Sequence, residues 1–237
     1  MVISPLSFLT RPIFPELCFH CKALLGPNKQ SLCQGCLTSL PKLSRLDSTK
    51  LQKIGASIKS DFKASLFFNE PVETLCYSLK YGGNYRLART LGQHIIGLDL
   101  ERRLQKSTQP APHFVLVPMP IHFRRKLKRG YNQSEELAKG ALKALRRSGY
   151  RGELLPLLEK TTHLKSQVNF GPFERWNNTA KAFAISGHQK KRVPEDAFLI
   201  LIDDTVTTGS SMLRAGECLK EAFPKNRLLL HALALEI

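Results

Sequence analysis

One segment near the carboxyl end of the chain limits the possible folds most strictly. Residues 199–202 are an unbroken apolar run, which is followed by Asp203, Asp204, a short hydroxyl-rich turn and Gly209. The pattern predicts a buried strand, a tight turn and then a helix at residues 210–223. A strand that is apolar on both faces is typical of a parallel sheet covered by helices on both sides. The segment therefore predicts an α/β fold.

The rest of the chain repeats this alternation of strand and helix. Strands are predicted at residues 64–68, 113–118, 154–158, 197–202 and 228–235, and helices at residues 71–80, 86–100, 133–147 and 210–223. Such an order forms parallel βαβ units, so residues 64–237 are predicted to form one doubly wound parallel sheet. Residues 46–63 are basic and polar and are predicted to be a connector, and residues 1–45 to be a small cysteine module with an apolar lead-in.

Four of the six cysteines have the spacing of a metal site. Cys18 and Cys21 are separated by two residues, as are Cys33 and Cys36, and eleven residues lie between the pairs. Paired cysteines in a reducing compartment are metal ligands rather than disulfides. Two such pairs supply the four thiolates of a tetrahedral Zn²⁺ site. The sequence therefore predicts a structural zinc ribbon.

The turn that follows the acid pair suits a phosphate group. Backbone N–H groups in a turn that leads into a helix converge on one point and favour an anion there. Gly209 permits a backbone conformation that other residues resist, and further donors come from the hydroxyls of Thr205, Thr207, Thr208 and Ser210. Because Asp203 and Asp204 would repel a phosphate, we predict that they accept hydrogen bonds from the vicinal hydroxyls of an attached ribose. The alternative is an acid-rich turn that only caps the helix.

Two other segments carry groups that suit anions. A predicted helix ends in Lys80 and Tyr81 before two glycines, which suits a pyrophosphate but is also an ordinary helix end. Further along, Tyr131 follows a segment with five basic side chains, Arg124, Arg125, Lys126, Lys128 and Arg129. This segment is expected either to bind single-stranded nucleic acid, with stacking on Tyr131, or to form a lid over a pyrophosphate. One segment can do both.

The net charge and the missing motifs narrow the function. Thirty-six Lys and Arg against 19 Asp and Glu give a net charge of +17. Such a basic protein usually faces nucleic acid, an acidic lipid surface or a phosphate-rich ligand, although a solvated basic surface without a partner is the alternative. The sequence has neither the apolar run of a membrane helix nor a signal peptide, so a cytoplasmic location is expected. Walker A and G-x-G-x-x-G motifs are absent, which argues against a nucleotide triphosphatase or a dinucleotide fold.

Several motifs occur in an order that matches a known family. Residues 199–211 resemble the phosphoribosyl pyrophosphate signature of type I phosphoribosyltransferases. The cysteine pairs, residues 80–82 (Lys-Tyr-Gly), residues 129–133 (Arg-Gly-Tyr-Asn-Gln) and the acid pair together resemble the ComF family of competence-associated proteins over nearly the whole chain. A further family element is matched by Gln167, Phe170, Arg175, Asn178, Ala182 and Phe183. Leu164 departs from the family, which often has threonine there.

The resemblance implies a type I phosphoribosyltransferase-like fold with an N-terminal zinc ribbon. It implies that phosphoribosyl pyrophosphate binds with Mg²⁺, its ribose 5-phosphate at residues 203–210 and its pyrophosphate at Lys80 and Tyr81. It also implies a role in natural transformation, in which the protein helps single-stranded DNA reach the cytoplasm and contacts the membrane DNA-uptake machinery peripherally.

Three functions are compatible with these features. The first is a DNA-handling protein that binds both phosphoribosyl pyrophosphate and single-stranded DNA. The second is an active transferase that moves phosphoribose onto a nucleobase or another small acceptor. The third is a zinc-ribbon adaptor for nucleic acid whose ligand site only regulates. No acceptor pocket and no catalytic residue can be identified from the sequence, so the sequence does not decide whether the protein is an enzyme.

Overall fold

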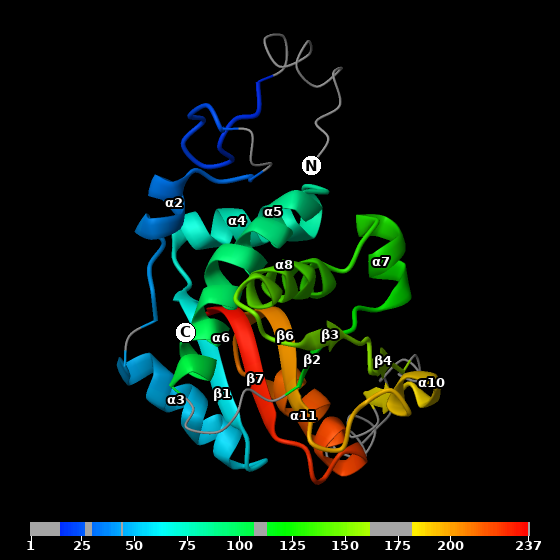
Figure 1. Ribbon diagram of the computed structural model, residues 1–237. Helices are drawn as coiled ribbons and strands as arrows, with labels where there is room; N and C mark the ends of the chain where they lie inside the picture. The colour runs from blue at the N-terminus through cyan, green and yellow to red at the C-terminus, as the bar shows by residue number, and fades with distance from the viewer. Residues whose placement is uncertain (1–14, 27–29, 44, 107–112, 162–181, 237) are drawn as a thin grey trace.

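A five-stranded sheet forms the centre of the computed structural model, which describes residues 15–26, 30–43, 45–106, 113–161 and 182–236 (Figure 1). In sheet order the strands are β1 (Asp61–Phe67), β7 (Leu228–Leu235), β6 (Phe198–Val206), β2 (Phe114–Pro118) and β3 (Gly152–Leu154). Each neighbouring pair in this sheet is parallel. The predicted α/β class with a parallel sheet is confirmed.

Helices cover both faces of the sheet. One face carries α4 (Glu70–Tyr81), α5 (Tyr85–Leu91), the π-helical turn η1 (Gly92–Ile96), α6 (Gly97–Gln105) and α8 (Gln133–Arg147). The other face carries α3 (Arg45–Ala56) and α11 (Ser210–Ala222). Each face of the sheet has its own hydrophobic core, and alternate residues of β6 belong to one or the other. Ile200 and Ile202 pack toward α4 and α8, while Leu199 and Leu201 pack toward α11. This two-sided burial explains why residues 199–202 are uniformly apolar.

The sheet has a topological switch point between β2 and β6. These strands are neighbours, yet α8, which follows β2, covers one face and α11, which follows β6, covers the other. Connections that leave in opposite directions open a crevice beyond the carboxyl ends of the two strands, and α/β proteins bind ligands in such crevices. The topology alone therefore predicts a ligand site beyond the end of β6, where Asp203 and Asp204 lie.

Helix α8 approaches α5 and η1 at backbone distance. A Cβ atom at Gly140 would collide with the carbonyl oxygen of Arg89, and one at Gly92 with the carbonyl oxygen of Leu137. The Arg89 guanidinium also lies 2.5 Å from the buried carboxylate of Glu136, which joins the two helices. The helix predicted at residues 86–100 extends from 85 to 105 and contains the π-helical turn where this contact is made.

Two predicted boundaries differ from the structure. Most of the connector predicted at residues 46–63 is α3, whose Leu51 is fully buried, and β1 begins at Asp61. The strand predicted at residues 154–158 is divided, because β3 ends at Leu154 and the next strand, β4 (Leu158–Lys160), pairs antiparallel with β5 (Phe183–Ile185) in a separate sheet. Pro156 lies between the two strands and cannot donate a ladder hydrogen bond.

The cysteine module packs directly on the helical layer. Its short helix α2 (Gln34–Ser39) lies beside α4 (Figure 1), and Leu32, Leu37 and Leu40 are buried in the same cluster as residues of α4 and α5. The Ser31 backbone N–H donates to the Thr90 hydroxyl at 3.1 Å. The module therefore shares a hydrophobic core with the sheet domain.

Candidate functional site

A cavity of about 610 Å³ opens at the carboxyl ends of β2 and β6. It occupies the switch point, with Asp203 and Asp204 on one wall and the residues that follow β2 on another. Of the residues singled out from the sequence, the cavity brings together Lys80, Tyr81, Arg125, Lys128, Arg129, Asp203 and Asp204. Two acids thus face a group of cations across one hollow, which suits a ligand that carries both hydroxyls and phosphates.

Asp204 is buried and fully engaged by its neighbours. Its Oδ2 lies 3.6 Å from Lys80 Nζ and accepts a hydrogen bond from Gln133 Nε2 at 3.4 Å. Its Oδ1 accepts from the backbone N–H of Thr205 at 2.8 Å. Since a buried carboxylate is costly unless it is paired, these contacts hold it in place. Lys80, which the sequence assigns to a pyrophosphate, pairs with the acid in this structure.

Asp203 lies in surroundings that favour its protonated form. Its Oδ1 accepts hydrogen bonds from Ser134 Oγ and from the Asp204 backbone N–H, both at 2.9 Å. Burial, and then the adjacent Asp204 charge, raise the pKa of Asp203 to about 8. At neutral pH the pair therefore tends to hold one proton, so that one acid can donate a hydrogen bond and the other can accept one.

The raised pKa of Asp203 predicts that this residue lowers the free energy of unfolding more at high pH than at low pH. In the unfolded chain the group titrates near 3.8, but in the folded protein it titrates near 8. The folded state therefore binds more protons within this range, and its stability falls as the pH rises through it. Asp203→Asn cannot ionise, so its stability relative to wild type should increase steadily from pH 5 to pH 8, by at most about 1.4 kcal/mol for each pH unit. Thermal unfolding at several pH values measures this.

Asp196→Asn is the matched control, because Asp196 is exposed and precedes β6, at the opposite end of this strand from the acid pair. This control should follow wild type at every pH. A difference between Asp203→Asn and wild type that does not vary with pH would contradict the raised pKa.

The Arg-Gly-Tyr-Asn-Gln motif, residues 129–133, connects the end of α4 and the end of β2 to the start of α8. Gly130 ends helix α7 (Phe123–Arg129) in the left-handed conformation, with φ of 78°. The Tyr131 hydroxyl donates to the carbonyl oxygen of Leu79, at the end of α4, at 2.6 Å. Asn132 caps α8 and donates to the carbonyl oxygen of Met119 at 2.9 Å. The motif thus fixes the start of α8, from which Gln133 and Ser134 reach the acids.

Helix α7 contains the basic segment and divides it between two faces. Arg125, Lys128 and Arg129, spaced by three and four residues, line the cavity. Arg124 and Lys126 are exposed and are not among the cavity-lining residues. The two expectations for this segment, a lid over pyrophosphate and a nucleic-acid contact, therefore correspond to different side chains.

The turn after the acid pair differs in detail from the sequence expectation. Strand β6 continues through the acids to Val206, and the hydroxyl of Thr205 is buried next to Cys76. Gly209 has φ of 77° and begins α11, and the exposed Thr208 hydroxyl lies 2.8 Å from that of Ser210. Thr205, Thr207, Thr208, Gly209 and Ser210 are not among the residues that line the cavity, whereas Ser211 is. Their proposed phosphate contacts stay predictions.

Lys160 was not identified from the sequence, and Phe183 was noted only as part of the family element. The two residues are register partners of β4 and β5, with Lys160 Nζ 5.9 Å from the ring centroid. Burial, followed by the charge of Arg125, lowers the pKa of Lys160, against the opposing effect of Asp203. No local pattern predicts that they meet, since only pairing between distant strands brings them together. Gln133 was quoted in a motif, but its contact with Asp204 was not anticipated.

Most of the predicted family element lies outside the described residues, namely Gln167, Phe170, Arg175 and Asn178, as does the departing Leu164. Ala182 is described, and it precedes β5 and accepts a backbone hydrogen bond from Thr161 at 3.1 Å.

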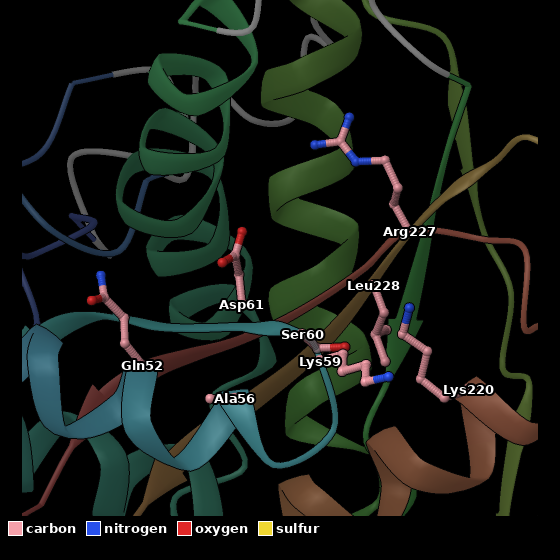
Figure 2. Close-up of a pocket in the computed structure, with 8 residues that line it drawn as sticks. All are labelled: Gln52, Ala56, Lys59, Ser60, Asp61, Lys220, Arg227 and Leu228. Carbon is pink, nitrogen blue, oxygen red and sulfur yellow. The ribbon is translucent and has the colours of Figure 1, made fainter.

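A second hollow, of about 480 Å³, lies at the amino ends of the strands, opposite the first cavity. Figure 2 shows that its lining comes from the end of α3, the starts of β1 and β7, and α11. Three of its charged side chains have partners within the fold, since Asp61 pairs with Arg103, Lys220 donates to the Asn226 carbonyl oxygen at 3.2 Å and Arg227 lies over the Phe198 ring. This hollow is at the amino ends of β1 and β7, away from the switch point, so we do not assign the functional site to it.

The four paired cysteines form a cluster that can hold a metal ion. Their sulfur atoms all lie within 4.8 Å of one another. The backbone N–H of Cys33 donates to Cys18 Sγ at 3.3 Å. Burial raises the pKa of Cys18, but the backbone N–H groups directed at its sulfur outweigh burial and lower the pKa to about 6. Burial and the neighbouring thiols raise the pKa of Cys36 to about 12. A cation among the sulfurs would relieve this crowding of thiolates.

Comparison with known proteins supports one family. No protein-family model matches the chain. It is 33% identical over 219 residues to "Competence protein ComFC" of Bacillus subtilis, an alignment that covers 90% of this chain and 81% of that protein. It is 25% identical over 217 residues to "Competence protein F" of Haemophilus influenzae, covering 86% and 90% of the two chains. Within the described residues, no helix has the length and apolar character needed to cross a membrane.

Proposed function

Because this chain belongs to the ComF family of competence proteins, we propose that it binds phosphoribosyl pyrophosphate with Mg²⁺ and handles single-stranded DNA in the cytoplasm during DNA uptake. The observation that carries the proposal is the position of Asp203 and Asp204. They lie at the end of β6, at the switch point of the sheet, in one cavity with Lys80 and the inner cations of α7. We propose accordingly that the sheet is a type I phosphoribosyltransferase-like fold.

Each part of phosphoribosyl pyrophosphate has a matching group in the cavity or in the turn leading into α11, where only Ser211 lines the cavity. The acid pair suits the two ribose hydroxyls, because a protonated acid donates a hydrogen bond and a carboxylate accepts one. The turn that leads into α11 suits the 5-phosphate. Arg125, Lys128 and Arg129 suit the pyrophosphate, and Mg²⁺ would neutralise part of its charge.

The contact between Lys80 and Asp204 suggests how the cavity responds to its ligand. Lys80 Nζ lies 3.6 Å from the carboxylate that would receive the ribose. A ribose hydroxyl that binds Asp204 competes with this pair, and the pyrophosphate of the same ligand offers Lys80 a stronger anionic partner. We therefore propose that Lys80 moves from the acid to the pyrophosphate as the ligand binds.

For the cysteine cluster we propose structural Zn²⁺. Four sulfur ligands complete a tetrahedral site and leave no open position for catalysis. The cluster is also part of the shared core, since Cys18 and Cys36 are buried with Leu32 and Leu37. Zinc would thus hold the module against α4 and α5.

An active transferase is the second candidate, and one observation favours it. The lining of the cavity includes the apolar side chain of Ile121 and the aromatic ring of Phe183, which lies beside Lys160. A flat acceptor such as a nucleobase could pack against this ring. Release of pyrophosphate in a screen of nucleobases and nucleosides would identify such an activity.

The ligand proposal predicts a strong preference for the intact molecule. In calorimetric titrations with Mg²⁺, wild type should bind phosphoribosyl pyrophosphate at least about tenfold more tightly than ribose 5-phosphate or pyrophosphate, because each of these lacks one set of the expected contacts. ATP is the control for unspecific attraction to a basic cavity. Equal affinity for all four anions would refute the site, and the cavity would then be only a basic surface.

A further inference from the structure

Three exposed tyrosines follow one another at intervals of four residues along α4 and α5, and we call them the tyrosine row. The exposed fractions of Tyr77, Tyr81 and Tyr85 are 65%, 60% and 41%. Tyr77 and Tyr81 are one helical turn apart on α4, with ring centroids separated by 4.7 Å and planes inclined by 43°. Tyr85 begins α5 directly after the turn that ends α4. Their positions therefore follow the path of the chain from one helix into the next.

Arginine side chains cover two of these rings. Arg129 lies 5.4 Å from the centroid of Tyr81, and Arg89 lies 5.2 Å from that of Tyr85. Arg89 is held by Glu136, and Arg86, the neighbour of Tyr85, lies 3.6 Å from Glu16. These ion pairs reduce the positive charge of the row, so aromatic contact must supply most of any binding energy there.

Only the middle tyrosine of the row reaches the cavity. Tyr81 lines the cavity, whereas Tyr77 and Tyr85 do not. Its link to α7 is direct, because Arg129 over Tyr81 and the hydrogen bond from Tyr131 to Leu79 both join that segment to the end of α4. The outward cations of α7, Arg124 and Lys126, therefore lie on an element attached to the row.

We propose that Tyr77, Tyr81 and Tyr85 form a stacking platform for the bases of single-stranded DNA, while the outward cations of α7 neutralise its phosphates. This inference rests on the DNA-handling function proposed above and assigns it a surface. Aromatic rings suit an unpaired strand of any sequence, because every base presents a π-face. A duplex hides these faces, so the platform distinguishes single strands from double strands.

The platform replaces the stacking role that the sequence predicted for Tyr131. That ring is only partly exposed, and its hydroxyl is bound to the Leu79 carbonyl oxygen at 2.6 Å. Replacing Tyr131 would remove this hydrogen bond between α4 and the segment before α8, so it would not report on stacking alone. Tyr77 and Tyr85 are the better probes, since neither lines the cavity.

The test measures fluorescence anisotropy with a labelled oligodeoxythymidylate and with an abasic strand of the same length. Tyr77→Ala and Tyr85→Ala should each weaken binding of the oligodeoxythymidylate by about fivefold or more. Both should leave the abasic strand and the salt dependence unchanged, because no charge is removed. Tyr77→Phe and Tyr85→Phe keep the ring and should bind like wild type. Leu98→Ala, which truncates an exposed apolar residue on α6, is the control that should change nothing.

The outcomes separate this inference from the function on which it rests. If wild type binds the base-containing strand but the alanine variants bind it equally well, the platform is wrong and the DNA-handling function stands. Equal weakening of both strands would also refute stacking. If wild type binds neither strand, DNA binding itself is refuted, and the row is then better explained as a protein contact. Unchanged binding of phosphoribosyl pyrophosphate by Tyr77→Ala shows that the variant is folded.

Discussion

Cys33→Ser is expected to lose the bound metal and to lower the melting temperature by at least about 10 °C. The effect should be large because structural Zn²⁺ contributes roughly 10–16 kcal/mol of apparent binding energy in small zinc domains, and that energy is coupled to folding. Cys33 also begins α2, where its sulfur accepts the Cys36 backbone N–H at 3.4 Å. Metal content by elemental analysis and thermal unfolding measure the two parts of the prediction.

Hydrogen exchange should show which segments are destabilised in Cys33→Ser. Because Leu32, Leu37 and Leu40 share a core with α4 and α5, protection should fall in residues 17–40 and also in the parts of those helices that face the module. Cys218→Ser is the control, since Cys218 is outside the cluster and should leave the metal content unchanged. Full metal content in Cys33→Ser, or purified wild type without metal, would show that the cluster is not a metal site.

Asp204→Asn is expected to weaken phosphoribosyl pyrophosphate by about tenfold or more while leaving pyrophosphate bound as well as before, or more tightly. Charged hydrogen bonds contribute roughly 1.5–3 kcal/mol each, and only the ribose-bearing ligand has hydroxyls to lose. The opposite change for pyrophosphate follows from the contact at 3.6 Å between Lys80 and Asp204. Without the carboxylate, Lys80 is free to bind the anion. Calorimetry with both ligands gives the comparison.

The exposed Asp196 again provides a control of the same type, because Asp196→Asn removes one charge outside the cavity. It should leave both affinities close to those of wild type. If Asp204→Asn weakened both ligands equally, the acid would only brace the loop through its bond to the Thr205 backbone N–H, and the ribose assignment would be wrong.

The sequence predicted the elements whose signals are local. The apolar run at residues 199–202 indicated a buried parallel strand, and the helix predicted at residues 133–147 is found as α8 with the same bounds. The cysteine spacing indicated a four-sulfur cluster, which the structure forms. In each case the decisive residues lie within a few positions of one another or repeat with the period of the element, so periodicity and spacing are sufficient.

The helix within the predicted connector, residues 46–63, was not identified from the sequence. The segment has a low apolar content, yet α3 buries Leu51 fully against the sheet. A helix that contributes few apolar side chains to a core has only a weak apolar pattern. Its identity depends on the neighbouring sheet, which the segment itself does not encode.

The composition of the cavity was decided by tertiary structure. Lys160 and Phe183 meet through the register of β4 and β5, and Lys80 reaches Asp204 because the end of α4 lies beside the end of β6. The basic segment forms a helix, α7, with one face toward the cavity and one toward solvent. The Tyr131 hydroxyl binds the Leu79 carbonyl oxygen. The sequence by itself determined which chemical groups are present and in which local elements they lie. Their partners depended on packing between distant segments, because burial, strand register and the close approach of α8 to α5 are properties of the assembled core.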